Sequence, residues 1–179
     1  MRPNKFTFRF YVKPFAKFIF SKVKFSGSFE DNQIPRQINK LWGVVSHRIH
    51  NSSFRVGFSC MNGEYSLFVY RYVSGMRVSQ KMPISFVNGD SVYFLLDISS
   101  GWMCVYVDRG ALEKSNIYTT MKNFLMSGIK GNKGDIIIEK AYEKICPKFI
   151  DISPYIGGSE KLPSDSNLKI ETFFKTFNQ

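Results

Sequence analysis

The residues that could carry out chemistry in this chain are few and widely scattered. Its two histidines, His47 and His50, lie three residues apart, and two neutral imidazoles can in principle hold one metal ion. A protein metal site usually has three or four ligands, and Arg48 between the histidines repels a cation. We therefore expect no metal site here and assign the pair to a loop or a sheet edge.

Carboxylates are not paired in the way that glycoside hydrolysis requires. That reaction uses two carboxyl groups facing one bond, and a β-sandwich glycanase commonly presents them at alternate positions of one strand. Here Glu30 and Asp31 are adjacent, so they would lie on opposite faces of a strand, whereas Glu139 and Glu143 have helical spacing. We interpret both pairs as solvated surface groups.

The three cysteines are widely spaced and lie in apolar surroundings. Cys60, Cys104 and Cys146 are odd in number, which favours reduced core thiols of a protein made in a cytoplasm over disulfides or metal ligands. None of them is near the histidines in sequence, so no Cys/His nucleophile is recognisable. We therefore expect that the chain is not an enzyme and uses no metal or other cofactor.

Positive charge is concentrated at the amino end of the chain. The 179 residues include 25 Lys and Arg against 14 Asp and Glu, a net charge of +11. Seven bases precede the first acid, Glu30, while residues 30–179 carry the other 18 bases and all 14 acids, a net of only +4. These early bases alternate with phenylalanines, and five of them form the predicted partner-binding arm: Arg2, Lys5, Arg9, Lys13 and Lys17.

Three kinds of partner fit such an arm. If the phenylalanines are buried, the bases face solvent or an acidic protein surface, which is the interpretation we favour. If the rings are exposed, the bases can hold phosphates while the rings stack on the bases of a nucleic acid. A membrane surface is the third alternative, although the longest uncharged stretch, Ile98–Val107, is far below the roughly 20 residues of a membrane span. No cleavage site follows the apolar Phe15–Phe20 segment, so we expect no signal peptide.

Short segments of alternating apolar and polar residues must position these groups. They are separated by Gly, Asn, Ser and Pro, a rhythm typical of a β-sandwich or barrel. The strongest prediction is a hairpin over Ser52–Val73, because Asn62-Gly63 supplies the two positive-φ positions of a type I′ turn. Pairing Met61 with Glu64 then fixes its register.

The two faces of this hairpin differ in character. One face is apolar and should be core, with Phe54 and Val56 as its centre. The other is polar and aromatic, and a tight reversal at Ser74-Gly75 should bring a third strand beside it. Four residues of this second face form a candidate glycan-binding site, unless another layer covers them as core: Arg55, Tyr70, Tyr72 and Arg77.

The remaining segments follow the same alternation. We expect strands at both ends of the chain, at residues 6–12, 148–156 and 168–174, with the terminal strands able to pair as neighbours. We expect an exposed loop at Lys130–Gly134 and one or two helical turns at Glu139–Cys146. Two apolar sets are predicted to face the core: first Phe6, Phe8, Phe10 and Val12, and then Phe94, Leu96 and Ile98 opposite Val107, Val105 and Met103.

A set of motifs is distributed along the chain: Ile38–Gly43, His47, His50–Ser52, Arg55–Gly57, Leu67–Tyr72, Pro154–Gly158, Pro163–Asp165 and Leu168–Ile170. Together they resemble the motifs of uncharacterised concanavalin-like jelly-roll proteins of Bacteroides-group bacteria and their tailed phages, over roughly residues 38–172. It implies a jelly roll of two antiparallel sheets, often a glycan-binding or virion-associated module. The chain departs from the pattern at Ser159 and Ser164, where the family has Asn and His.

Together these features predict an all-β fold, an antiparallel two-sheet jelly-roll (concanavalin-like) sandwich with little helix. Residues 31–179 would form the sandwich, and residues 1–30 a basic, Phe-rich strand or arm packed on it. The predicted function is a non-catalytic binding or structural module, a phage virion component assembling through its basic surface on an acidic partner, such as other virion proteins. The alternative is a lectin-like, carbohydrate-binding sandwich of a gut bacterium, and the third is a basic nucleic-acid-binding protein.

Overall fold

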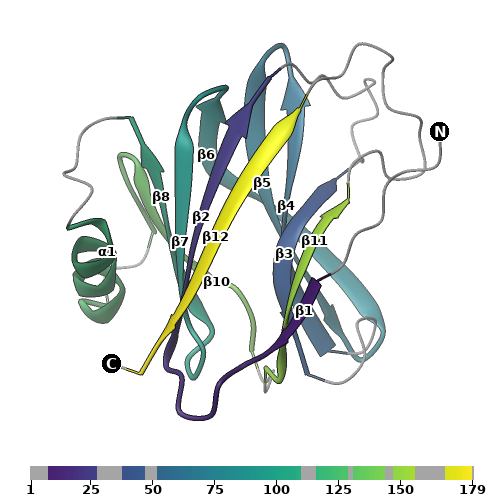
Figure 1. Ribbon diagram of the computed structural model, residues 1–179, viewed down its shortest axis with the longest axis vertical. Coiled ribbons are helices and arrows are strands. Elements are labelled where there is room, and N and C mark those ends of the chain that lie inside the picture. The colour runs from purple at the N-terminus through teal and green to yellow at the C-terminus, as the bar shows by residue number, and fades with distance from the viewer. Residues whose placement is uncertain are drawn as a thin grey trace. The chain divides into compact units, whose positions relative to one another are not determined.

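The fold is dominated by strands, as predicted. A computed structural model describes residues 8–27, 38–46, 52–109, 116–128, 131–143, 147–155 and 168–178. These residues form two six-stranded, mainly antiparallel sheets and one helix (Figure 1). The chain divides into two compact units, one built on each sheet, and each is described here by itself.

The first unit comprises Met1–Val12, Ser26–Asn88 and Ile145–Lys169. Its strands lie side by side in the order β1 (Phe8–Tyr11), β11 (Phe149–Tyr155), β3 (Asn39–Val45), β4 (Ser52–Met61), β5 (Glu64–Val73) and β6 (Met76–Val87). Strands far apart in sequence therefore become neighbours, because β1 and β3 flank β11.

The predicted hairpin of the first sheet is confirmed. Met61 pairs with Glu64, and both turn residues have positive φ, 53° at Asn62 and 75° at Gly63, as a type I′ turn requires. The second reversal, at Ser74-Gly75, also forms, and it places Arg77 of β6 directly opposite Tyr72 of β5. The alternation therefore sorts the two faces of β4 and β5 as expected.

The amino-terminal strand departs from the prediction that its phenylalanines are core. Phe8 and Phe10 pair with Ile152 and Ile150 of β11, yet their side chains are 58% and 53% exposed. The reason is position, since β1 is a four-residue strand that pairs with β11 on one side and, among the described strands, has no neighbour on the other. Alternation identified the faces of this strand correctly but not their burial.

The second unit comprises Lys13–Phe25, Gly89–Lys144 and Ile170–Gln179. Its strand order is β12 (Lys169–Phe177), β2 (Phe18–Ser26), β7 (Ser91–Asp97), β8 (Trp102–Asp108), β10 (Ile136–Lys140) and β9 (Gly131–Lys133). The expectation that the terminal strands pair with each other is wrong, because β1 and β12 are edges of different sheets.

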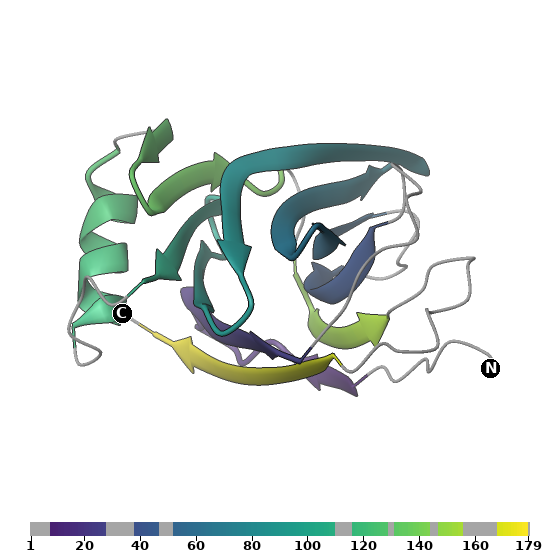
Figure 2. The same cartoon turned by 90° about the horizontal axis from the view of Figure 1, so that it is seen from above.

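The helix α1 (Ile117–Met126) was not predicted, and it covers one face of the second sheet. It lies beside β8 in both views (Figures 1 and 2). Ile117, Met121 and Leu125 recur every four residues, so one stripe of the helix is buried. These side chains join a core that also contains the strand residues Phe18, Tyr93, Leu95, Cys104, Tyr106, Ile136 and Ile138.

The ladder between β7 and β8 has the predicted faces in a shifted register. Phe94 lies opposite Val105, not Val107, and Leu96 lies opposite Met103. A two-residue turn was assumed, whereas the chain reverses through four residues that Asp97 organises: its Oδ1 accepts hydrogen bonds from the backbone N–H groups of Ser99 and Ser100, at 2.9 and 3.2 Å. A longer turn moves the register by two residues and so keeps every side chain on its face.

Two further local predictions are wrong. Of the exposed loop expected at Lys130–Gly134, Gly131–Lys133 form the short strand β9. Of the helical turns expected at Glu139–Cys146, Glu139 and Lys140 belong to β10, and residues 130 and 144–146 lie outside the described residues. The reason is the apolar run Ile136–Ile138, whose backbone pairs with β8 on one side and with β9 on the other. After β10, the Tyr142 hydroxyl donates a 2.7 Å hydrogen bond to the Ile98 carbonyl oxygen.

Candidate functional site

A row of paired residues runs across β1, β11, β3, β4 and β5 of the first sheet and contains several polar side chains. In successive strands Arg9 lies opposite Asp151, Asp151 opposite Gly43, Gly43 opposite Arg55, and Arg55 opposite Tyr70. Residues in one such row point to the same face, so these five residues share one surface of the sheet. The register of four strand pairs therefore brings together groups that are distant in sequence.

Asp151 is the anion at the centre of this row. Its carboxylate is fully buried and accepts two hydrogen bonds from Arg9, from Nε to Oδ1 at 2.7 Å and from Nη2 to Oδ2 at 2.9 Å. Arg55 approaches from the other side, with Nη2 at 3.4 Å from Oδ2. The hydrogen bond to Asp151 raises the pKa of Arg9, although partial burial offsets some of that effect. A buried carboxylate is thus held between two guanidinium groups.

Gly43 makes the contact between Arg55 and Asp151 geometrically feasible. It lies on β3, between the strands that carry these two residues. A Cβ at position 43 would collide with the Phe54 carbonyl oxygen and would lie 2.7 Å from Cγ of Arg55. The Arg55 side chain therefore passes over the bare backbone of Gly43 to reach Asp151.

Tyr70 closes the row and is surrounded by cations. Its side chain is only 1% exposed, and its ring lies 5.1 Å from the guanidinium carbon of Arg77 and 5.9 Å from Nζ of Lys40. The ring of Tyr72 meets it edge-on, with centroids 6.4 Å apart. Both distances to the cations are within the range of cation–π attraction. We call these side chains the Arg–Tyr cluster: Arg9, Lys40, Arg55, Tyr70, Tyr72, Arg77 and Asp151.

Two buried polar atoms of the cluster are unsatisfied. Within the described part of the chain, Nε of Arg55, a residue 4% exposed, has no hydrogen-bond partner, and the Tyr70 hydroxyl makes no hydrogen bond of good geometry. Burial raises the pKa of Tyr70 well above its ordinary range. The charges of Arg55 and Arg77, together with a weak hydrogen-bonding contribution from Arg55, offset this only in part, so the phenol stays protonated. Buried polar groups are normally paired, and an unpaired one calls for a physical explanation, such as a catalytic role or stored strain.

The cluster as a whole is positively charged. Arg9, Lys40, Arg55 and Arg77 contribute four positive charges against the single negative charge of Asp151, a balance of +3. Its rings offer flat apolar surfaces beside these cations. Such a surface can bind an anion whose skeleton also has apolar faces, and an acidic sugar combines these two properties.

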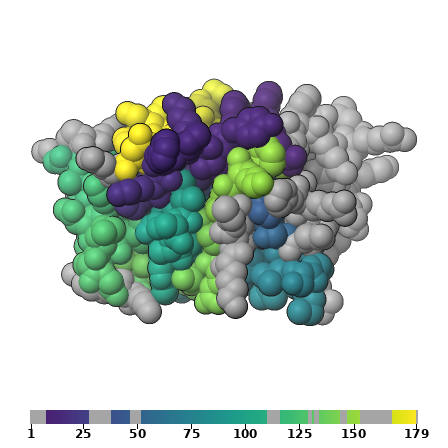
Figure 3. Space-filling view, turned by 90° about the horizontal axis from the view of Figure 1, so that it is seen from below, coloured from purple at the N-terminus to yellow at the C-terminus, as the bar shows by residue number. Residues whose placement is uncertain are grey.

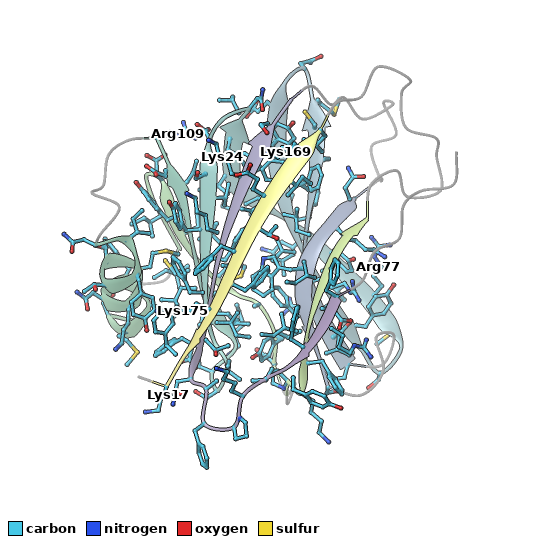
Figure 4. All side chains as sticks on the ribbon, in the orientation of Figure 1. Lys17, Lys24, Arg77, Arg109, Lys169 and Lys175 are labelled. Carbon is cyan, nitrogen blue, oxygen red and sulfur yellow. The ribbon has the colours of Figure 1, made fainter. Side chains whose placement is uncertain are left out.

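The four predicted glycan-binding residues are brought together, with unequal access. Arg55 and Tyr70 are buried, Tyr72 is half-buried and Arg77 is exposed (labelled in Figure 4). The predicted basic arm is not one feature: Arg9 is held by Asp151, whereas the exposed Lys13 and Lys17 belong to the second unit. Other candidates named from the sequence lie outside the described residues: Arg2, Lys5, Glu30, Asp31, His47, His50 and Cys146.

Sequence reasoning missed three members of the site. Asp151 stands between Ile150 and Ile152 in an alternating strand, which marked it as facing away from the core but not as the partner of two arginines. Lys40 and Gly43 carried no signal, because their roles depend on which strands become neighbours. The two described cysteines, Cys60 and Cys104, are buried as expected of core thiols, and burial raises the pKa of Cys104 to about 12. No helix among the described residues has the length and apolarity to span a membrane.

Comparison with known proteins gives a fold relationship without a family. No protein-family model and no curated protein matches the chain. Among solved structures, an alginate lyase from Pseudomonas aeruginosa matches with a TM-score of 0.52 and 7% sequence identity, over 92% of this chain. The chain spans 65% of the length of that lyase. A polysaccharide lyase of family 18 matches with a TM-score of 0.43 and 10% identity, over 91% of this chain and 74% of its own.

These findings confirm the predicted fold class and correct the predicted function. The chain has the antiparallel jelly-roll fold that the alginate lyase shares. The expectation of a non-catalytic virion module is wrong on this comparison. The exclusion of catalysis also fails, because it rested on missing carboxylate pairs, nucleophiles and metal ligands. A lyase instead needs a proton acceptor and a cation that stabilises developing negative charge, which tyrosine and arginine can supply.

Proposed function

We propose that the chain is a carbohydrate-binding protein that recognises an acidic polysaccharide at the Arg–Tyr cluster. The observation that carries this proposal is the contact between Arg77 and Tyr70, an exposed cation lying over a buried aromatic ring. Arg77 supplies the reachable charge for a sugar carboxylate. The half-buried Tyr72, directly opposite it in the next strand, supplies a ring and a hydroxyl beside that charge.

The charge balance favours an acidic sugar over a neutral one. Asp151 accepts hydrogen bonds from Arg9 and contacts one nitrogen of the buried Arg55, which leaves the exposed Arg77 as the cation of the cluster that a ligand anion can reach. A guanidinium group matches a carboxylate with two parallel hydrogen bonds, which adds geometric selectivity to the charge attraction. The fold likeness to an alginate lyase supports a uronate polymer as the first ligand to test.

Binding of alginate oligosaccharides, measured by isothermal titration calorimetry, tests this proposal. We expect saturable binding that Arg77→Ala weakens by about tenfold, the effect of losing a contact of about 1.4 kcal/mol. Arg71→Ala is the matched control, because Arg71 is on β5 with Tyr70 and Tyr72 but faces the other side of the sheet. The affinity of the wild-type protein for neutral glucans should be no higher than the affinity of Arg77→Ala for alginate. Equal losses in the two variants, or no binding of any uronate polymer, would reject the site.

Cleavage of the bound polymer by β-elimination is a second candidate function. In that reaction a base removes the proton at C5 of a uronate, the C4–O bond breaks, and the departing oxygen takes up a proton. A double bond then remains between C4 and C5. Arg77 beside the carboxylate would stabilise the charge that develops on it, and the hydroxyl of Tyr72, the residue opposite Arg77, would exchange protons with the sugar.

Ultraviolet absorbance of the unsaturated product distinguishes cleavage from binding. We expect absorbance to rise when the protein is mixed with alginate, and Tyr72→Phe to abolish the rise while leaving calorimetric binding within about twofold of the wild type. Binding without any rise in absorbance would reject the lyase and keep the binding protein.

A further inference from the structure

The turn that leads from β1 to β2 exposes a phenylalanine in an unfavourable backbone conformation. Lys13, Pro14, Phe15 and Ala16 form a hydrogen-bonded turn in which the Ala16 N–H donates to the Lys13 carbonyl oxygen at 3.1 Å. Phe15 has φ 69° and is 89% exposed. A proline followed by a residue of positive φ is the pattern of a type II turn, whose third position normally holds Gly or Asn. Phe15 therefore destabilises the folded chain in two ways, through backbone strain and through exposed apolar surface.

Nothing in the folding of the second unit requires a ring at this position. Glycine would adopt the same φ without strain, and the ring of Phe15 makes no aromatic or cation–π contact among those found in the described residues. The next apolar residues, Phe18 and Ile19, are buried and anchor β2. The turn is thus held by its neighbours while Phe15 projects from it. Strain of this kind is a reason to look for a function.

The charges around Phe15 indicate the chemistry of what it meets. Lys13 and Lys17 flank it, both are exposed, and residues 8–27 contain no Asp or Glu. The Lys17 N–H donates to the Phe177 carbonyl oxygen at 2.8 Å, which places the end of β12 beside the turn, and Lys175 lies at this same end of the sheet (Figure 4). Seen from below, the amino-terminal segment is at the surface beside β12 (Figure 3). Asp97 lies opposite Phe18, and its carboxylate accepts hydrogen bonds from the backbone of Ser99 and Ser100. The turn itself therefore presents one apolar ring between two exposed lysines.

We propose that the Lys13–Lys17 turn is a contact site for an anionic lipid surface, with Phe15 inserted among the lipids and the two lysines at the headgroups. A phenylalanine lacks the polar end that a ring needs for hydrogen bonding to a sugar. On a projecting turn it also forms no cradle around a ligand. An apolar ring at a convex tip can instead enter the boundary between headgroups and acyl chains, where flanking lysines meet negative charge. This contact is separate from the Arg–Tyr cluster and does not depend on the proposed function.

Co-sedimentation with vesicles tests the contact. Vesicles of phosphatidylcholine with one-third phosphatidylserine should bind the full-length protein, and pure phosphatidylcholine vesicles should bind it at least about fivefold more weakly, because each lysine contributes near an anionic surface. Phe15→Gly should reduce binding to the anionic vesicles by about tenfold or more while leaving the midpoint of urea unfolding unchanged or higher. Loss of binding without loss of stability separates the contact from misfolding.

A fluorescent variant and a charge variant complete the test. The emission of Phe15→Trp should shift to the blue on addition of anionic vesicles, whereas Val87→Trp, an exposed position of the first unit, should give no shift. Lys13→Gln with Lys17→Gln should weaken binding to anionic vesicles and remove its salt dependence. The proposal is overturned if Phe15→Gly binds as the wild type does, or if it changes the sedimentation of the free protein, since the ring would then meet another copy of the chain.

Discussion

Arg9 and Asp151, which are 142 residues apart in sequence, form a two-point contact, with Nε–Oδ1 and Nη2–Oδ2 distances of 2.7 and 2.9 Å. The contact joins β1 to β11 through their side chains as well as through the backbone ladder. The same carboxylate also contacts the buried Arg55. One anion therefore stabilises an edge strand and neutralises a cation inside the candidate site.

Replacing Asp151 should be among the most damaging single changes in the first sheet. Asp151→Asn leaves Arg55 buried without a negative partner, and removing one member of a buried ion pair costs about 3–5 kcal/mol. Arg9→Ala should cost only about 1 kcal/mol, since the Arg9 side chain is partly exposed and its charge is screened by water. Urea unfolding of the three proteins measures the difference. Similar losses in both variants would show that Arg55 does not depend on Asp151.

Gly43→Ala tests whether the Arg55 side chain needs the bare backbone beneath it. The added methyl would meet the Phe54 carbonyl oxygen and the Arg55 side chain, so either the strands separate or Arg55 turns away. We expect a loss of about 1–3 kcal/mol in unfolding free energy, together with weaker alginate binding. Gly63→Ala is a useful comparison because, apart from its chain neighbours, no atom lies within 4 Å of the Cβ that alanine would add. Its cost should therefore come from the positive φ alone, and binding should be kept. Unchanged stability in Gly43→Ala would contradict the geometry.

The Tyr70 hydroxyl should add little to stability. It is buried and makes no hydrogen bond of good geometry in the described residues, and leaving such a group unpaired costs about 1–3 kcal/mol. Tyr70→Phe should therefore unfold at the same or a higher urea concentration than the wild type, while its affinity for alginate stays within about twofold, because a ligand meets the exposed Arg77 and not this buried hydroxyl. A clear loss of stability would mean that the hydroxyl has a partner and that its role is structural.

The turn after β7 should add a pH-dependent term to stability. Burial raises the pKa of Asp97, but hydrogen bonds from Ser99 and Ser100 outweigh it, so the folded-state pKa lies below its usual value. The stabilisation is therefore complete above the pKa of an unfolded aspartate and is lost as the pH falls through it toward the folded value. Asp97→Asn removes this term. The difference in unfolding free energy between wild type and variant should be largest near neutral pH and shrink on acidification, and a difference that does not vary with pH would contradict the assignment.

The sequence predicted what depends on neighbouring residues and failed where distant partners decide. The Asn62-Gly63 hairpin was predictable because the turn residues and the alternation on both sides agree, and the four residues of the glycan-binding prediction did come together. The helix α1 did carry a signal, since Ile117, Met121 and Leu125 have helical spacing, but the weak pattern around it concealed the period. The burial of Phe8 and Phe10 could not be predicted, because it depends on β1 being an edge strand.

The candidate site shows the same difference between features set by neighbouring residues and features set by distant partners. The faces of Arg55 and Tyr70 follow from the hairpin register alone. The contacts of Asp151 and Lys40 require knowledge of which strands lie side by side, and no local pattern encodes that order. The exclusion of catalysis failed for a chemical reason, because it considered carboxylates, nucleophiles and metal ligands but neither tyrosine as a group that exchanges protons nor arginine as a cation that stabilises negative charge.

The chain passes from one unit to the other five times, at residues 12–13, 25–26, 88–89, 144–145 and 169–170. No contiguous piece of the gene therefore encodes either unit, and a cut at any of these points separates at least one strand from the rest of its sheet. Synthesis on the ribosome cannot complete one sheet long before the other, since β11 and β12 both come from the last part of the chain. Proteolysis at a single exposed loop should thus release neither unit as a complete fragment. Recombination of gene segments likewise cannot exchange one unit without the other.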